Sequence, residues 1–102
     1  MTRMKLNSKQ RAFLRSKAHG LKPVVHIGTA GLTDAAIQSL LDAFNTRELL
    51  KVRVQEGAPD DAWETADRIV ERLDGVSVAQ TIGKVMVLYR PFPDGPELKL
   101  PG

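Results

Sequence analysis

A short segment bracketed by two glycines carries the residues with the clearest chemical potential. It consists of Gly28-Thr29-Ala30-Gly31, follows an apolar run of β-branched residues, and precedes Thr33, a favourable helix N-cap. Small residues between two glycines leave the backbone as the surface of the loop. A loop that leads into a helix N-terminus presents unpaired N–H groups, which bind anions such as phosphate. Because the same spacing also occurs in plain tight turns, the loop alone does not decide between the two interpretations.

Basic side chains accompany this segment in the sequence. Lys22 directly precedes the apolar run, and Lys51 and Arg53 are two positions apart in a second apolar stretch. A spacing of two places both side chains on the same face of a strand. Arg11 and Arg15 lie four apart in a helical segment and are further candidates. Each of these residues would also suit an ordinary solvated surface.

The charges of the 102-residue chain are unevenly distributed. The net charge of +3 combines a net +7 in residues 1–53 with a net −4 in residues 54–102. From Arg3 to Lys22 there are seven basic residues and no acidic one. A merely solvated helix usually carries both signs interleaved, whereas such separation favours a polyanionic partner such as a nucleic acid.

The sequence offers no recognisable group for catalysis. It contains no cysteine, which excludes disulfides, thiolate metal sites and cysteine nucleophiles. His19 and His26 lack acidic partners at metal-ligand spacing, and we expect them at a helix end and in a strand. No phosphate-binding Walker loop, dinucleotide-binding fingerprint or nucleophile elbow is present. We therefore expect no enzyme, no cofactor, no metal and no small-molecule substrate.

Hydrophobic periodicity predicts the elements that position these residues. Helices are expected over about residues 8–18, 34–45 and 61–73, and strands over 24–27, 48–55, 76–81 and 85–90. The order α-β-α-β-α-β-β indicates an α/β protein of the two-layer α+β type, with a mixed sheet and helices packed on it. In the strand at 48–55, Lys51 and Arg53 should project from the sheet face that the core does not use.

Two further expectations concern the second half of the chain. Trp63 is expected in the buried stripe of the third helix, because the carboxylates around it would repel a nucleic acid. Residues 1–91 form a single domain, and residues 92–102 form a tail rich in Pro and Gly that should be extended or loosely ordered.

Four segments, in this order, resemble the signature of the CRM domain (chloroplast RNA splicing and ribosome maturation). They are Gln10-Arg11-x-x-Leu14-Arg15-x-x-Ala18-His19, the run Lys22-Pro-Val-Val-His-Ile-Gly-Thr-Ala-Gly-Leu-Thr33, the strand at 48–54, and Ile-Gly-Lys-Val-Met-Val-Leu-Tyr-Arg at 82–90. A lone domain of this length is similar to bacterial YhbY-type proteins. The resemblance implies a four-stranded mixed sheet packed with three helices, similar to the C-terminal domain of a bacterial translation initiation factor.

The resemblance also implies a function. It implies RNA binding in assembly of the large ribosomal subunit, with precursor rRNA as the partner and a Gly-x-x-Gly loop likened to that of KH domains. Family loops often carry a polar or basic residue between the glycines, whereas Thr29 and Ala30 are uncharged, so more of the binding falls on Lys22, Lys51 and Arg53. We expect a cytoplasmic monomer with no membrane segment. The alternative is a protein–protein adaptor on pre-ribosomal particles that attracts RNA only non-specifically.

Overall fold

The computed structural model describes residues 6–102, so the basic residues Arg3 and Lys5 lie outside the described part. The elements are α1 (Ser8–Ala18), β1 (Pro23–Ile27), α2 (Asp34–Phe44), β2 (Leu49–Val54), α3 (Ala62–Arg72), β3 (Ser77–Ile82) and β4 (Val85–Tyr89). The predicted order of three helices and four strands is confirmed, and the observed ends lie within two residues of the expected ones.

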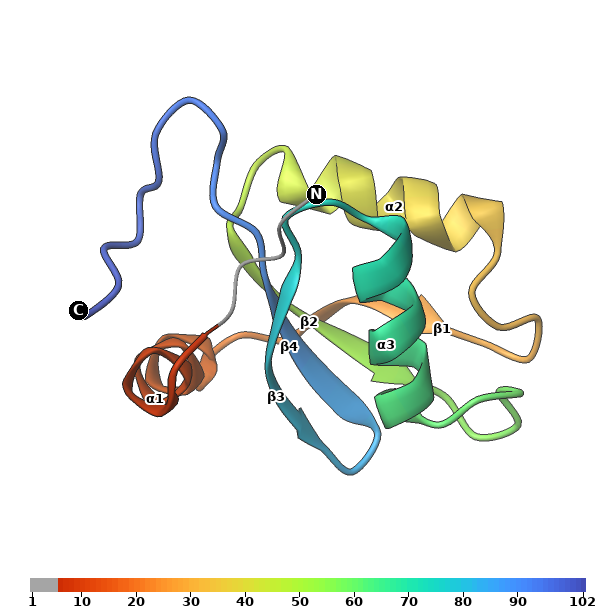
Figure 1. The fold of residues 1–102 in the computed structure, drawn as a ribbon. Helices are drawn as coiled ribbons and strands as arrows, with labels where there is room; N and C mark the ends of the chain where they lie inside the picture. The colour runs from red at the N-terminus through yellow and green to blue at the C-terminus, as the bar shows by residue number, and fades with distance from the viewer. Residues whose placement is uncertain (1–5) are drawn as a thin grey trace.

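The four strands form one mixed sheet in the order β1-β2-β4-β3. The strands β1 and β2 run parallel, whereas β4 is antiparallel to both β2 and β3. The helices α2 and α3 pack on one face of this sheet, and α1 packs on the other (Figure 1). This order makes β1 and β3 the two edge strands, so features beside them are separated by the full width of the sheet.

Each helix begins at a side chain that satisfies a free backbone N–H group. Asn7 and Gln10 form a reciprocal capping box at the start of α1. The Thr33 hydroxyl accepts from the N–H of Ala36 at the start of α2, and the Asp61 carboxylate accepts from the first turn of α3. These caps explain why the helices begin where the sequence predicts.

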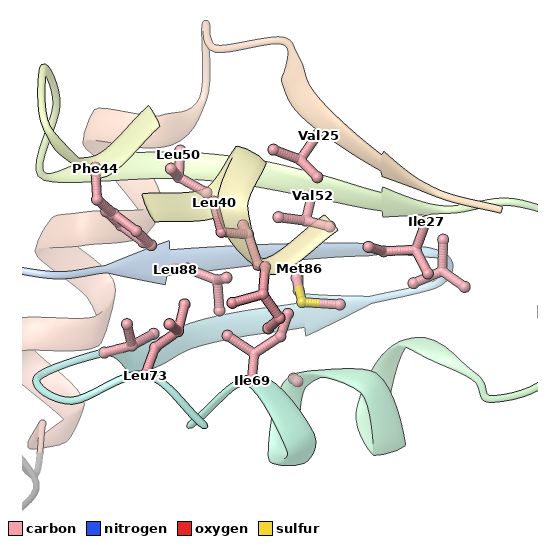
Figure 2. Close-up of a cluster of buried hydrophobic side chains, with 14 of the residues drawn as sticks. Val25, Ile27, Leu40, Phe44, Leu50, Val52, Ile69, Leu73, Met86 and Leu88 are labelled. Atoms are coloured by element: carbon pink, nitrogen blue, oxygen red, sulfur yellow. The ribbon is translucent and has the colours of Figure 1, made fainter. Parts of the chain in front are cut away.

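The larger hydrophobic core lies between the sheet and the helices α2 and α3 (Figure 2). Its members include Val25, Ile27, Leu50, Val52, Met86 and Leu88 from the strands, Leu40 and Phe44 from α2, and Ile69 and Leu73 near the end of α3. The alternation along β2 sends Leu50, Val52 and Val54 into this core. Consequently, Lys51 and Arg53 point to the opposite face, as predicted.

A smaller core occupies part of that opposite face. Leu14 and Ala18 of α1 are buried there with Leu49 of β2 and Tyr89 of β4. The expectation that the core does not use this face is therefore wrong for the end of the sheet that carries Leu49. The face is covered at one end only, because α1 is a single short helix.

The C-terminal tail is held against the domain by a buried carboxylate. Glu48 is only 4% exposed and accepts hydrogen bonds from the N–H groups of Phe92, Glu97 and Leu98, at 2.7, 2.9 and 2.8 Å. Leu98 packs against the smaller core, and the Gln10 side chain donates to the carbonyl of Pro101 at 3.1 Å. The tail turns at residues 93–94, where the N–H of Gly95 donates to the carbonyl of Phe92 at 3.3 Å, and it is anchored along this side of the molecule.

Trp63 does not lie in the buried stripe of α3. Its side chain is 64% exposed, and the stripe is formed by Ala62, Thr65, Ala66 and Ile69. These positions follow helical spacing, and Trp63 follows Ala62 by one residue, which turns it about 100° away from the core. The sequence prediction for Trp63 is therefore wrong, and the indole is free to contact another molecule.

Candidate nucleic-acid interface

The Gly28–Gly31 segment forms a closed turn between β1 and α2. The N–H group of Gly31 donates to the carbonyl of Gly28 at 3.0 Å, and the N–H of Thr33 donates to the carbonyl of Gly31 at 3.0 Å. The N–H of Gln55 donates to the carbonyl of Ile27 at 2.8 Å, which fixes the start of the turn to the end of β2. The loop is thus held at both ends by the backbone.

The turn leaves several N–H groups available for an anion. Among residues 6–102, the N–H groups of Thr29, Ala30, Asp34 and Ala35 make no hydrogen bond within the chain. Thr29 and Ala30 are exposed, and α2 begins at Asp34. Free N–H groups at a helix N-terminus coincide with the positive end of the helix dipole. This geometry suits a phosphate oxygen.

The two glycines of the loop have different roles. Gly31 has a φ of +74°, and a Cβ atom added there would lie 2.8 Å from Cγ of Pro59. Gly28 does not have a positive φ, and its nearest neighbour would be Oε1 of Gln55 at 3.7 Å. The packing of the loop against the segment before α3 therefore requires glycine at 31 and tolerates a side chain at 28.

Two of the predicted basic residues lie on the uncovered part of the sheet, toward the loop. Arg53 is exposed and pairs in register with His26 on β1 and with Val85 on β4, so all three side chains lie on the α1 side of the sheet. Lys51, half-buried, is the next residue on this face. Among residues 6–102, neither Lys51 nor Arg53 forms an ion pair.

His26 joins this surface although the sequence did not identify it as a site residue. It is exposed between the buried Val25 and Ile27. This alternation was visible in the sequence. Only the pairing of β1 with β2 shows that His26 lies beside Arg53.

Lys22 lies at the far end of β1 from the loop. It precedes Pro23, which pairs with Lys51, and the five residues of β1 separate it from Gly28. At the usual rise of a strand, these five residues span about 17 Å. Lys22 therefore adjoins Lys51, and it lies too far from the loop to support an anion bound there.

Arg11 and Arg15 lie away from the loop as well. They belong to the wall of a groove formed with the edge strand β3 and with α3, whereas the loop follows the other edge strand, β1. The predicted site residues thus divide into a group near the loop and β2, and a separate pair beside β3.

Two acidic side chains near the loop are paired with basic ones. Glu56 accepts a hydrogen bond from Lys84, and Asp34 pairs with Arg72 at 3.1 Å. The hydrogen bond and the charge of Lys84 hold the pKa of Glu56 below its ordinary value. These pairs reduce the negative potential that an approaching anion would meet. Lys84 was not among the sequence candidates, because its position beside the end of β2 depends on the pairing of β4.

Other kinds of site are not evident in residues 6–102. No helix in this range combines the length and the apolar character needed to cross a membrane. No group of three or more His, Asp and Glu side chains in the same range is arranged to hold a metal ion.

Comparisons with known proteins show to which family the chain belongs. The profile of the CRS1 / YhbY (CRM) domain matches residues 6–90. YqeI of Bacillus subtilis, named a probable RNA-binding protein, is 36% identical over 96 residues, covering 94% of this chain and 99% of that protein. A protein of Haemophilus influenzae, named an RNA-binding protein, is 38% identical over 96 residues, covering 94% of this chain and 95% of its own length.

A solved structure shares the fold. The solution structure of the hypothetical protein SAV1595 from Staphylococcus aureus superposes with a TM-score of 0.79 at 35% identity, covering 95% of this chain and all of that one. The names of these relatives describe RNA binding rather than catalysis, in agreement with the prediction that the chain is not an enzyme. The matched range includes all four strands and all three helices, and the chain belongs to the CRS1 / YhbY (CRM) domain family.

Proposed function

We propose that this protein binds RNA through the Gly28–Gly31 loop and the adjoining uncovered part of the sheet. The observation that carries the proposal is the placement of Arg53 and Lys51, which form no ion pair within residues 6–102, on the sheet face that leads to the N–H groups of the loop. Family membership and the names of the relatives support RNA as the polyanion.

The proposed binding mode relies on the backbone of the RNA. One phosphate is held by the N–H groups of Thr29, Ala30 and the start of α2, and further phosphates are neutralised by Lys51 and Arg53. Lys22 extends this basic strip at the other end of β1. Phosphate contacts position an RNA without reading its sequence, so the shape of the RNA determines where the protein binds.

The resemblance noted in the sequence points to a particular RNA. We propose precursor rRNA of the large ribosomal subunit as the partner, bound in the cytoplasm by a monomer during subunit assembly. Because the proposed contacts are made largely to phosphates, the affinity should fall steeply with salt concentration.

The test is fluorescence anisotropy with large-subunit rRNA fragments across a salt series. A Lys51→Ala/Arg53→Ala variant should bind at least about tenfold more weakly. The slope of the logarithm of its binding constant against the logarithm of salt concentration should be shallower by about 1.5. A Lys9→Ala/Lys99→Ala variant removes the same charge from exposed positions elsewhere and should bind almost as the native chain does. Equal weakening of both variants would show that only total charge matters and would overturn the proposed surface.

The loop is tested without altering its glycines. Ala30 is exposed, so Ala30→Glu places a carboxylate beside the free N–H groups while leaving the turn intact. This variant should weaken RNA binding at least about tenfold, whereas Ala12→Glu, at an exposed position on α1, should have a smaller effect. An Ala30→Glu variant that is folded and binds RNA normally would exclude the loop from the interface.

A further inference from the structure

We propose that the edge of the sheet formed by β3 binds an extended segment of a partner protein. The edge lies in a groove of about 450 Å³ between α1 and α3. Arg11 and Arg15 form one wall, Trp63, Ala66 and Asp67 the other, and residues 78–81 the floor. Figure 1 shows β3 between the two helices. This surface is distinct from the RNA site proposed above, and the proposal does not depend on that site.

The floor of the groove is the part of the edge strand β3 that follows Ser77. Within residues 6–102, β3 pairs with β4 alone. Outward-pointing N–H and C=O groups of an edge strand form hydrogen bonds with an added extended chain. The pairing of β3 with β4 shifts register between Val78 and Gln80, so the regular part of the edge is the stretch from Gln80 to Ile82. We expect the partner segment to pair along this stretch.

The exposed indole of Trp63 provides an apolar anchor. Trp63 is 64% exposed. It takes no part in packing α3 against the sheet, because the buried stripe of this helix runs through Ala62, Ala66 and Ile69. Tryptophan residues that project beside a groove frequently dominate the energetics of protein interfaces. The indole therefore suits an aliphatic side chain of a docked segment.

The two walls of the groove differ in charge. This difference determines which side chains a bound segment should carry on each of its faces. The exposed Arg15 forms no ion pair with residues 6–102, and the guanidinium of Arg11 is held in place by hydrogen bonds to Leu6 O and Ser8 Oγ, at 2.7 and 3.3 Å. The opposite wall presents Trp63 and the carboxylate of Asp67. Successive side chains of an added strand point to opposite faces of the sheet. A complementary segment therefore alternates acidic residues with apolar or basic ones.

A nucleic acid fits this groove less well than a peptide. RNA carries negative charge along its whole length, whereas the α3 wall of the groove presents Asp67, and the exposed surface of α3 also carries Glu64 and Glu71. The two arginines of this helix, Arg68 and Arg72, are paired with Asp60 and Asp34. The carboxylates of Glu64, Asp67 and Glu71 would repel phosphates placed near Trp63. A peptide can match both walls, because each of its side chains can differ in charge.

The experiment uses the full chain labelled with ¹⁵N and a capped ten-residue peptide in which Glu alternates with Leu and Lys. The peptide should shift the amide signals of Gln80–Ile82 and the indole N–H signal of Trp63. A scrambled peptide of the same composition, without the alternation, should bind at least about fivefold more weakly. Absence of shifts at β3 with the alternating peptide would overturn the proposal.

Matched variants assign the contact to the two walls. Arg15→Glu and Trp63→Ala, both at exposed positions, should each weaken peptide binding at least about tenfold while leaving the remaining amide spectrum unchanged. Lys9→Glu and Leu21→Ala change exposed residues outside the groove and should bind the peptide normally. Equal losses in these controls would overturn the assignment.

Two other occupants are tested in the same spectra. Shifts at β3 and Trp63 caused by decauridylate and not by the peptide would replace the proposal with an RNA surface. The same shifts caused by raising the concentration of the protein alone would indicate a second copy of the chain. The Lys51→Ala/Arg53→Ala variant should retain peptide binding, so failure of the RNA proposal is distinguishable from failure of this one.

Discussion

On one face of the sheet, α2 and α3 cover the strands along their length, whereas on the other face α1 and the C-terminal tail cover only one end. The covered face buries Ile27 and Leu50 in the larger core. The other face buries Leu49 and Tyr89 beneath α1 and leaves Arg53 exposed. The two ends of this half-covered face therefore differ in role. The end beneath α1 stabilises the fold, and the end that carries Arg53 remains available for contacts with another molecule.

The comparison explains why the basic side chains can lie where they do. A charged residue inside the larger core would lose its hydration without a partner. At the open end of the α1 face, Arg53 and His26 keep their hydration and stay available for an anion. Substitutions on the two faces should therefore differ in kind, because one set changes stability and the other changes binding.

The largest expected contrast is between Leu40 and Val24. Leu40 is fully buried in the larger core, so Leu40→Ala should lower the free energy of unfolding by about 2–5 kcal/mol. Val24 on β1 is 42% exposed, so Val24→Ala should cost less than about 1 kcal/mol. Urea unfolding followed by circular dichroism measures both. A cost at Val24 similar to that at Leu40 would mean that the open end is covered in solution.

The tail anchor at Glu48 should produce the next largest effect. Glu48→Ala leaves three partly buried N–H groups without their acceptor and should cost about 1–3 kcal/mol of unfolding free energy. Hydrogen exchange of the Phe92 and Leu98 amides should accelerate in this variant. Glu97→Gln is the control, because its exposed side chain takes no part in the anchor. Protection that persists in Glu48→Ala would show that the tail is held by its apolar residues alone.

Alanine substitutions at the two loop glycines should differ in their effect on stability. Gly31→Ala should destabilise the fold by about 1–2 kcal/mol, because the residue has a positive φ and its Cβ would meet Pro59. Gly28→Ala should change stability by less than about 0.5 kcal/mol, since its neighbourhood is open. Thermal unfolding of both variants checks this, and equal costs would contradict the assigned difference.

The periodic features of the sequence were sufficient to predict the elements. The spacing of Ile37, Leu40 and Phe44 marks the core-facing side of α2, and alternation in β2 correctly separates Leu50 from Lys51. Local caps such as Thr33 set the helix ends. These features are encoded within a few residues, so a single sequence reveals them.

Features that depend on distant contacts were not predictable in the same way. Alternation cannot show that α1 covers Leu49 while leaving Arg53 exposed, because both lie on the same strand face. Likewise, Arg11 and Arg15 were grouped with the loop by charge, although the strand order places them beside the other edge of the sheet. The prediction for Trp63 was wrong because neighbouring residues of a helix point in different directions, so that Ala62 is buried and Trp63 is exposed.

Alkaline pH should weaken the smaller core selectively. Burial, followed by the charge of Glu48, raises the pKa of Tyr89 above its ordinary value. The stability contributed by the neutral phenol is therefore fully present below about pH 10, the unfolded value, and is lost as pH rises through the folded pKa. Tyr89 is the single tyrosine of the chain, so tyrosinate absorbance follows it directly.

Urea unfolding between pH 9 and 11 should show this decline in the native chain and a shallower one in Tyr89→Phe. Glu48→Gln should lower the pKa of Tyr89, because it removes the neighbouring charge. An unchanged pH dependence in Tyr89→Phe would assign the decline to other groups, and the two cores would then respond alike to alkali.

The smallest expected effect concerns the ion pair beside the loop and is visible in binding rather than stability. Glu56 forms an ion pair with Lys84. Because the pKa of Glu56 is lowered, the pair stays ionised until the pH falls through that lowered pKa. Glu56→Gln removes the carboxylate and frees the Lys84 ammonium, so RNA affinity should rise by about two- to fivefold. Glu71→Gln, which removes the same charge from exposed α3, should change affinity less. Because the two variants have equal net charge, any difference between them measures how close the bound RNA lies to the loop end of the sheet, and equal affinities would place it elsewhere.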